Sequence, residues 1–391
     1  MGKQIMRLLA KTMAGLEGVL AEELEEIGAL KVEKLIRAVR FEGDLAMMYK
    51  ANYCCRTALN ILVEQFSFNF TSQDDFYDSI YNYNWDPLFE HDTTFLVDAT
   101  ISGDVFTNSH YTALLCKDAI VDYFRRKYNQ RPSVDRFDPH LKINVYIRNN
   151  ECTILLDSSG ESLFKRGYRI ATGEAPIKEV LAAGIIKLAG WNGQSNFYAP
   201  MCGSGTFAVE AGMIASKIPA GYYREQFGFM YWPNYNELLW NKIKDEADME
   251  ITETEIEIHA SDIDPKMVKF TYRNAQKAKL HKDITITESS FEDFDFPKEG
   301  GIIIFNPPYG ERMELSDVEE SYKLIGDTLK KNCANYEVYM IAGGTLVHKY
   351  VGLKPSKKLT LFNGAIECQM LKYDMYEGSK KEDYNENIVQ N

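Results

Sequence analysis

The chain has 391 residues, 45% of them hydrophobic, which is more than one ordinary core serves, so two or three globular domains are expected. A formal net charge of -13 at pH 7 argues against binding of polyanions by overall charge, so any nucleic-acid surface must be a local basic patch. The 7 cysteines include no C-x-x-C pair, which argues against a disulfide framework and a zinc cluster.

No apolar run is long enough to span a bilayer. Charged residues such as Lys11, Glu17 and Glu22 interrupt the N-terminal stretch before a signal-peptide core can form. We therefore expect a soluble, cytoplasmic protein with no membrane partner and no bound metal. Its oligomeric state is left open.

The chain begins with strand-like and helix-like pieces in alternation. Leu16, Leu20, Leu24 and Ile27 have helical spacing, and the stretches VEKLIRAVRFEG and ALNILVEQF have the texture of strands. This pattern predicts a small α+β unit over 1–65.

A second α+β unit is predicted over 66–160. It contains an acidic, aromatic helix near DDFYDSIYNYNW, a strand TFLVDATIS, a helix TALLCKDAIVDYFRRKY, and the strands LKINVYIRNN and CTILLDSS.

A third domain is predicted over 161–378, because GESLFKRGYRIATGEAP is a polar connector and strands alternate with helices after it. The last two strands, KLTLFN and ECQMLKYDM, have no room for a helix between them. The fold class is therefore α/β, with a mostly parallel, doubly wound sheet that ends in an antiparallel pair. The charged tail 379–391 is predicted to be disordered.

A glycine-rich loop follows the first strand of this third domain, in APMCGSGTFAVEAGMIA. Glycines let the backbone pass close to a ligand, and the helix that follows offers free N–H groups. Gly203, Gly205 and Ala208 also satisfy the G-x-G-x-x-G/A dinucleotide pattern, so a nicotinamide or flavin site is a competing interpretation. A P-loop is excluded because no Gly-Lys-Ser/Thr follows.

The next strand ends in HASDIDPKMV, which puts Asp262 at the carboxyl edge of the sheet. A carboxylate there accepts hydrogen bonds from ribose hydroxyls. The alternative is that Asp262 or Asp264 caps the helix that begins near Pro265.

The strand IIIFN runs into two prolines, Pro307 and Pro308, which cannot donate to a ladder. The strand must stop at Asn306 and continue as a stiff loop. In such a loop the Asn306 side-chain oxygen and the Pro307 carbonyl can accept hydrogen bonds from an exocyclic amine, and Tyr309 offers a face for stacking. The alternative is an ordinary proline turn.

A glycine loop, an acidic strand end and NPPY in this order resemble class I S-adenosylmethionine-dependent methyltransferases that modify exocyclic amines. With KRGYR, APIKEVLAAGII and FGFMYWP, nearly the whole chain resembles the bacterial THUMP-containing 23S rRNA guanine-N2 methyltransferases. The resemblance implies a Rossmann-like seven-stranded methyltransferase sheet with an antiparallel last strand. It also implies that a ferredoxin-like unit and a THUMP RNA-binding domain precede this sheet.

The resemblance assigns roles to residues of this chain. The catalytic residues are Asn306, Pro307, Pro308 and Tyr309. The residues that bind S-adenosyl-L-methionine are Ala175, Pro176, Lys178, Cys202, Gly203, Ser204, Gly205, Thr206, Asp262, Ile263 and Ser290. Two positions depart from the family pattern, because Ala199 and the pair Ser289–Ser290 stand where acidic residues are usual.

For RNA, a local positive patch lies in 125–148 and continues into the connector. We expect contacts from Arg125, Arg126, Lys127, Arg131, Lys165, Arg166 and Arg169. The aromatic stretch within 222–240 is either a lid packed on the sheet or a platform on which bases stack.

The expected reaction is methyl transfer to N2 of a guanosine in 23S rRNA, with the base flipped into the NPPY pocket. The alternatives are a tRNA guanine-N2 or a DNA/RNA adenine-N6 methyltransferase, or a noncatalytic RNA-binding assembly factor that has lost the cofactor.

Overall fold

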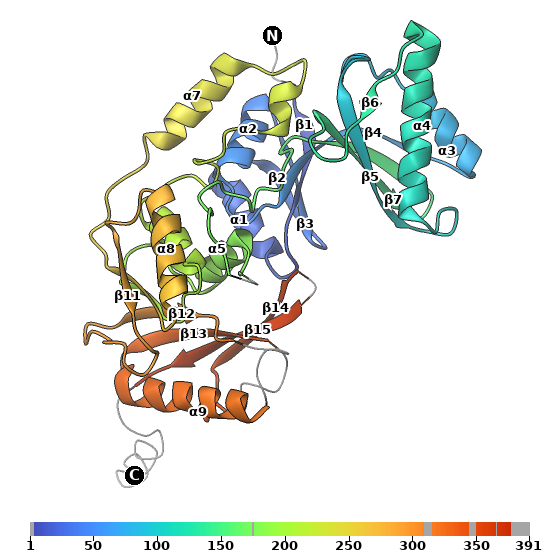
Figure 1. Ribbon diagram of the computed structural model, residues 1–391. Helices are drawn as coiled ribbons and strands as arrows, with labels where there is room; N and C mark the ends of the chain where they lie inside the picture. Colours follow the sequence, from blue (N-terminus) through green and yellow to red (C-terminus); the bar gives the residue numbers. More distant parts are fainter. Residues whose placement is uncertain (1–3, 174–175, 309–314, 344–348, 365, 377–391) are drawn as a thin grey trace, which may run out of the picture. The chain divides into compact units, whose positions relative to one another are not determined.

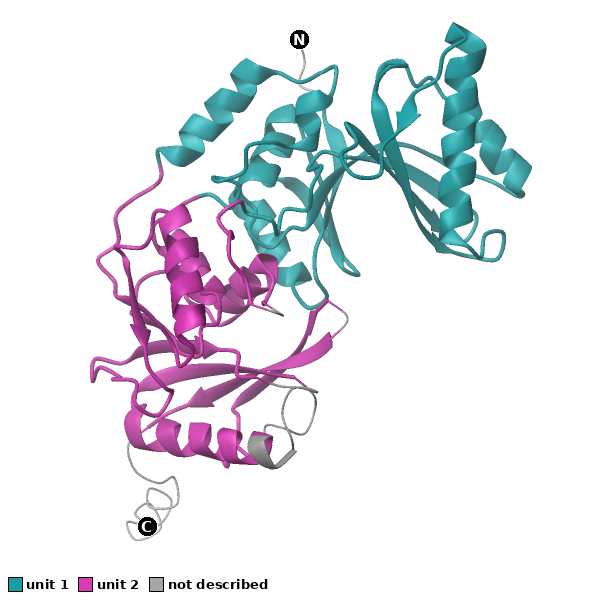
Figure 2. Ribbon diagram, in the orientation of Figure 1, with its two compact units in different colours: residues 1–166, 219–249 teal, residues 167–218, 250–391 magenta. Residues whose placement is uncertain are grey.

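The computed structural model describes residues 4–173, 176–308, 315–343, 349–364 and 366–376. Figure 1 labels the helices and strands, and Figure 2 colours the chain by its two compact units. Unit 1 consists of Met1–Arg166 and Pro219–Met249, and unit 2 consists of Gly167–Ile218 and Glu250–Asn391.

The described part of unit 1 is built on one eight-stranded sheet in the order β2-β3-β1-β4-β8-β7-β5-β6. The long strand β4 (Asn60–Asn69) joins its two halves, because its first residues pair with β1 and its longer part pairs with β8. The other strands are β1 (Met6–Lys11), β2 (Leu30–Leu35), β3 (Ala38–Gly43), β5 (Thr94–Ser102), β6 (Ser133–Val134), β7 (Leu141–Arg148) and β8 (Glu151–Asp157).

Side-chain caps begin several helices of unit 1, as polar residues before an apolar run favour. Asp44 accepts from Met47 N at 3.0 Å, and Asn108 accepts from Tyr111 N at 3.0 Å. One of the helices, which covers Ser109–Tyr128, lies along the sheet half that contains β5 (Figure 1). The helices are α1 (Glu17–Glu26), α2 (Leu45–Cys54), α3 (Gln73–Tyr81), α4 (Ser109–Tyr128), the 3₁₀ turn η1 (Gly228–Tyr231) and α7 (Glu237–Asp248).

The aromatic segment Pro219–Met249 packs on α2 and belongs to unit 1. The Tyr49 ring lies 4.5 Å from Phe229 and 5.8 Å from Trp240, measured between ring centroids, and all three side chains are buried. Both the boundary prediction 161–378 and the expectation of a lid on the methyltransferase sheet grouped this segment with the third domain. The structure differs because its large aromatic side chains complete the core of unit 1 instead.

The described part of unit 2 contains a seven-stranded sheet in the order β11-β10-β9-β12-β13-β15-β14. The first five strands in this order are parallel, and β15 is antiparallel to both of its neighbours. This confirms the predicted fold class. The strands are β9 (Phe197–Ala199), β10 (Ile258–Asp262), β11 (Ile284–Glu288), β12 (Gly301–Phe305), β13 (Tyr336–Gly343), β14 (Lys357–Asn363) and β15 (Ile366–Asp374).

The strand β12 is a continuous apolar run because helices cover both faces of a parallel sheet. Ile303 and Ile304 are fully buried. On one face, Ile303 packs in a core cluster with Tyr322 and Ile325 of the helix that covers Leu315–Asn332. The helices of unit 2 are α5 (Glu179–Leu188), α6 (Thr206–Ala215), α8 (Pro265–Lys277) and α9 (Leu315–Asn332).

The order of the strands positions the site. β9 lies between β10 and β12, so the three carboxyl ends meet at one edge of the sheet. The order of the strands reverses there, since β10 and β11 lie on one side of β9 whereas β12 and β13 lie on the other. Ligands bind at such a switch point in open α/β sheets.

Candidate active site

The glycine loop joins β9 to α6 and contains three residues with left-handed backbone, Met201 at φ 51°, Gly203 at φ 56° and Gly205 at φ 82°. A Cβ added at Gly205 would lie 2.6 Å from Thr271 Cγ2 of α8, so this glycine permits a close approach of loop and helix. A Cβ added at Gly203 would meet nothing within 4 Å among the described atoms. The loop is therefore open above Gly203 and closed on the side of α8.

Asp262, the last residue of β10, faces this loop. Its carboxylate accepts from Gly203 N at 2.8 Å and from Asp264 N at 3.0 Å. Burial raises the pKa of this carboxyl, although both hydrogen bonds act in the opposite direction. The capping role belongs to Asp264, whose carboxylate accepts from Lys266 N at 2.8 Å in the first turn of α8.

Asn306 follows β12 directly, as the two prolines after it require. Its Oδ1 atom is buried and has no hydrogen-bond partner within the described part of the chain. A buried acceptor without a partner is costly, so this atom can accept a hydrogen bond from a ligand that supplies the donor. Pro307 is buried and Pro308 is exposed, while Tyr309 lies outside the described residues.

The segment that contains the expected cofactor contacts Ala175, Pro176 and Lys178 leads into α5. Pro176 is partly buried, and Lys178 is the N-cap residue of α5. Ala175 lies outside the described residues.

The remaining cofactor candidates differ in environment. Ile263 is 71% exposed beside Asp262, where an apolar ligand surface can cover it. Burial raises the pKa of the Cys202 thiol to about 12, so this group stays protonated. The Ser290 hydroxyl donates to Asp293 Oδ2 at 2.8 Å, which places a carboxylate next to the position where the family usually has one.

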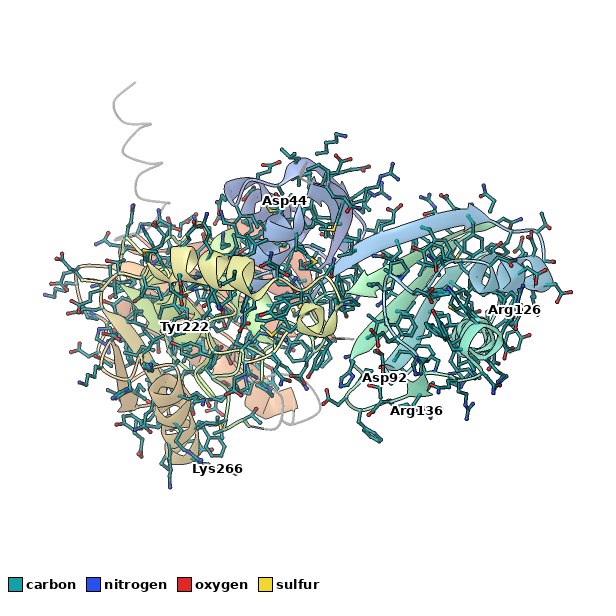
Figure 3. The ribbon with its side chains drawn as sticks, turned by 90° about the horizontal axis from the view of Figure 1, so that it is seen from above. Asp44, Asp92, Arg126, Arg136, Tyr222 and Lys266 are labelled. Atoms are coloured by element: carbon teal, nitrogen blue, oxygen red, sulfur yellow. The ribbon has the colours of Figure 1, made fainter. Side chains whose placement is uncertain are left out.

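The expected basic patch is partly neutralised within unit 1. Arg125 pairs with Asp122 at 2.5 Å and Lys127 pairs with Asp86. Arg126 lies on α4 (Figure 3), with its guanidinium 5.6 Å from the centre of the Tyr81 ring. These side chains and Arg131 are exposed, so a phosphate can reach them. Their role in RNA binding stays a prediction.

Two of the residues expected to contact RNA instead make contacts within the protein, and their role in RNA binding stays a prediction. Arg166 is 1% exposed and donates to the carbonyls of Leu163 and Arg56. Arg169 forms an ion pair with Glu179, which is almost fully buried. Lys165, in contrast, is exposed and pairs with Glu161, so it stays a candidate.

Sequence reasoning missed Asn274 and Thr271, which hold the glycine loop from α8. Thr271 Oγ1 donates to Gly203 O at 2.9 Å, and Asn274 Nδ2 donates to Ser204 O at 2.9 Å. A signal was present, because both residues lie with Ala275 on the buried face of α8. A polar pair at i and i+3 on such a face needs partners.

The site fits S-adenosylmethionine on two observations. The loop is open above Gly203, and an exposed apolar side chain, Ile263, adjoins the Asp262 carboxylate. Among the described residues, no cluster of side chains is suited to hold a metal ion, and no helix is long and apolar enough to cross a membrane. The fold and this edge of the sheet define a class I methyltransferase with a Rossmann-like sheet.

Comparison with known proteins agrees. The family model described as RMKL-like, methyltransferase domain, matches 166–372, after a THUMP domain at 70–157 and an RlmL ferredoxin-like domain at 7–62. The chain belongs to this RMKL-like methyltransferase family.

The relatives show how much of the chain is shared. The putative RNA methyltransferase slr0064 of Synechocystis sp. is 35% identical over 94% of this chain and 96% of its own length. The ribosomal RNA large subunit methyltransferase K/L of Shewanella frigidimarina is 34% identical over 98% of this chain, but the match covers only 54% of that protein. This chain therefore spans about half the length of the K/L proteins.

A similar solved structure contains a bound ligand. SMU.472, a putative methyltransferase complexed with SAH, superposes with a TM-score of 0.86 at 29% identity, over 97% of this chain and 100% of that one. SAH is what S-adenosylmethionine becomes once its methyl group has been transferred, so this related structure supports S-adenosylmethionine as the expected cofactor. The residues that touch it here stay a prediction.

Proposed function

We propose that the protein transfers a methyl group from S-adenosylmethionine to the exocyclic N2 amine of a guanosine in 23S ribosomal RNA. The observation that carries this proposal is the buried Asn306 Oδ1 atom, which has no partner within the described residues. The RNA class is supported by the THUMP match at 70–157 and by the printed names of the relatives.

An exocyclic guanine amine is a poor nucleophile because its lone pair is delocalised into the ring. Asn306 Oδ1 accepts a hydrogen bond from one amine proton, and the Pro307 carbonyl accepts from the other. Together they favour a pyramidal nitrogen with its lone pair directed away from the ring. Because two prolines stiffen this loop, the acceptors are in place before the base arrives.

The cofactor, when bound, supplies an electrophilic sulfonium methyl group. The proton that the amine loses becomes acidic once nitrogen carries the methyl, so it leaves to solvent or to Asn306, and no general base acts beforehand. A stacked base cannot reach such a pocket, so the guanosine is turned out of its helix. Tyr309 is proposed to stack on it.

A second candidate is methylation of adenine N6, because the same two acceptors fit any exocyclic amine. Guanine in tRNA is a third. A noncatalytic assembly factor is a further candidate, because Ala199 and Ser290 stand where the family usually has acidic residues. The open space above Gly203 weakens that candidate, because a protein that had lost its cofactor would have no need to keep it.

The test uses undermethylated 23S rRNA, bulk tRNA and labelled S-adenosylmethionine, followed by mass spectrometry of the digested nucleosides. The proposal predicts labelled N2-methylguanosine from rRNA only. N6-methyladenosine, or label in tRNA alone, would contradict it. The Asn306→Ala protein, prepared identically, is the control for contaminating host enzymes.

A further inference from the structure

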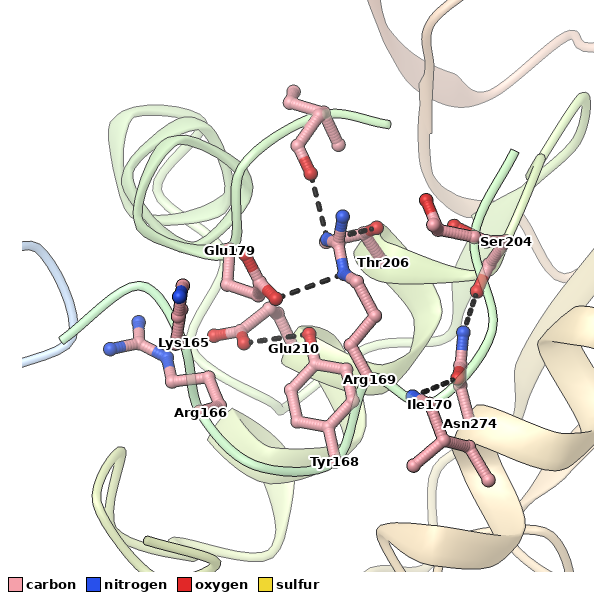
Figure 4. Close-up of polar contacts among 12 residues, drawn as sticks. Lys165, Arg166, Tyr168, Arg169, Ile170, Glu179, Ser204, Thr206, Glu210 and Asn274 are labelled. Atoms are coloured by element: carbon pink, nitrogen blue, oxygen red, sulfur yellow. Dashed lines mark hydrogen bonds and ion pairs between the residues drawn. The ribbon is translucent and has the colours of Figure 1, made fainter. Parts of the chain in front are cut away.

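The segment Tyr168–Ala171, near the start of unit 2, is bound to elements of the cofactor edge by several side-chain contacts (Figure 4). Tyr168 donates its hydroxyl proton to Glu210 Oε1 of α6 at 3.0 Å. Both side chains are buried. A buried hydrogen bond therefore attaches this segment to α6.

Arg169 links three pieces of chain. Its Nε lies 2.9 Å from Glu179 Oε1 in the first turn of α5, an ion pair whose angle does not make it a hydrogen bond. Its Nη2 donates to Ile177 O and to Thr206 Oγ1, both at 2.8 Å. Thr206 is the first residue of α6, directly after the glycine loop. One guanidinium thus holds the starts of α5 and α6 together.

Asn274 of α8 holds the same segment from the other side. Its Oδ1 accepts from Ile170 N at 2.9 Å and Ala171 N at 3.0 Å, and its Nδ2 donates to Ala171 O at 2.8 Å and Ser204 O at 2.9 Å. The orientation of the amide is unambiguous, because its oxygen faces N–H groups and its nitrogen faces carbonyls.

These contacts set the direction of the loop peptides. The carbonyls of Gly203 and Ser204 are both held by α8, through Thr271 and Asn274. Across a trans peptide the next N–H points opposite to the carbonyl. The Ser204 N–H therefore points away from α8, as it must to meet a ligand above the loop.

We propose that Arg169 and Asn274 are positioning residues that hold the cofactor loop, Cys202–Thr206, in its binding conformation. These two side chains act through the loop, so their replacement should lower the affinity of the protein for its cofactor. This inference concerns cofactor binding only, so its test does not depend on which base is methylated.

The test compares Asn274→Ala and Arg169→Lys with a matched control, Gln276→Ala. Gln276 is an amide side chain on the same helix but exposed. Lysine keeps the charge opposite Glu179 but lacks the planar fork that reaches Ile177 and Thr206. We expect the Kd for SAH, measured by calorimetry, to rise about tenfold in both variants, since each loses one or more hydrogen bonds to the loop.

With saturating RNA, the KM for S-adenosylmethionine should rise by a similar factor while kcat changes less than twofold, and the control should match the wild type. If the two residues had a purely structural role, their replacement would lower the melting temperature without raising KM relative to kcat. If Asn274→Ala does not fold, Arg169→Lys decides. SAH affinity within twofold of wild type in a folded Arg169→Lys protein would overturn the inference.

Discussion

Gly203 and Gly205 lie two positions apart in one loop, but the structure requires them for different reasons. Gly205 faces Thr271, and its φ of 82° is unfavourable for any residue with a Cβ. We predict that Gly205→Ala lowers the free energy of unfolding by about 2–4 kcal/mol, from left-handed strain and overpacking together. Urea unfolding of Gly205→Ala, compared with Gly203→Ala, measures this loss of free energy.

Gly203→Ala should cost only about 1–2 kcal/mol, because its Cβ enters open space. It should instead weaken SAH binding, since the added methyl occupies the side of the loop that the ligand needs. Equal destabilisation by the two substitutions would show that the space above Gly203 is not open.

At the residue scale, the sequence suffices to expect Gly203, Asp262 and Asn306 at one site, because each lies at or shortly after the end of a strand and the carboxyl ends of parallel strands meet at one edge. Arg169 could not. A basic residue in a polar connector is usually solvated, and nothing in the sequence pairs it with Glu179, which is buried. Asn274 binds Ser204 across 70 positions, a pairing that only the tertiary packing of α8 creates.

At the scale of single elements, strand β8 ends at a buried carboxyl group, that of Asp157. Asp157 accepts from Asn60 Nδ2 at 2.9 Å and from Ser159 N at 2.9 Å, and burial raises its pKa from 3.8 to about 6. The folded protein therefore keeps this proton up to about pH 6, whereas the unfolded chain releases it near pH 3.8. Stability from this group is greatest at low pH and decreases as pH rises between those values.

We predict that the free energy of unfolding of the wild type contains a contribution of on the order of 1–3 kcal/mol that is lost between pH 4 and 7. Asp157→Asn cannot titrate and should flatten this slope. Urea unfolding at four pH values, with the exposed carboxyl variant Asp74→Asn as control, measures it. An unchanged slope in Asp157→Asn would assign the pH dependence to other groups.

The strands of unit 2 were predictable because each is a short apolar or alternating run bounded by polar turns. The placement of Pro219–Met249 was not. Its sequence is aromatic enough for a lid, a platform or a core, and only the contact with Tyr49 and Tyr53 of α2 distinguishes them. Tyr231 differs from the rest, as it is 41% exposed and stacks on His140 with 4.6 Å between centroids.

For the whole molecule, the position of Pro219–Met249 in unit 1 means that a substitution in this segment should change the stability of unit 1 but not the affinity for the cofactor. Trp240 is buried against Tyr53 and Phe227, so Trp240→Ala should destabilise unit 1 by about 3–5 kcal/mol. SAH affinity should stay within twofold, because the candidate cofactor residues lie in unit 2. Calorimetry and thermal unfolding of the same sample test both statements. A large loss of SAH affinity in the folded variant would place the segment at the cofactor site.

With a net charge of -13, the proposed binding of RNA requires the local basic patch. Replacing Arg125, Arg126 and Lys127 by Gln should weaken RNA affinity and reduce the slope of log K against log salt by about 2. Lys277→Gln with Lys279→Gln, two exposed changes in unit 2, is the control. An unchanged salt slope in the triple variant would remove α4 from the RNA surface.

The most direct test of the account is single-turnover methyl transfer by Asn306→Ala with saturating S-adenosylmethionine and rRNA, together with calorimetry of SAH. If Asn306 Oδ1 holds the amine, the variant binds SAH like the wild type but transfers the methyl group at least about a hundredfold more slowly. Transfer at the wild-type rate, with SAH bound normally, would contradict the acceptor role on which the proposed reaction depends.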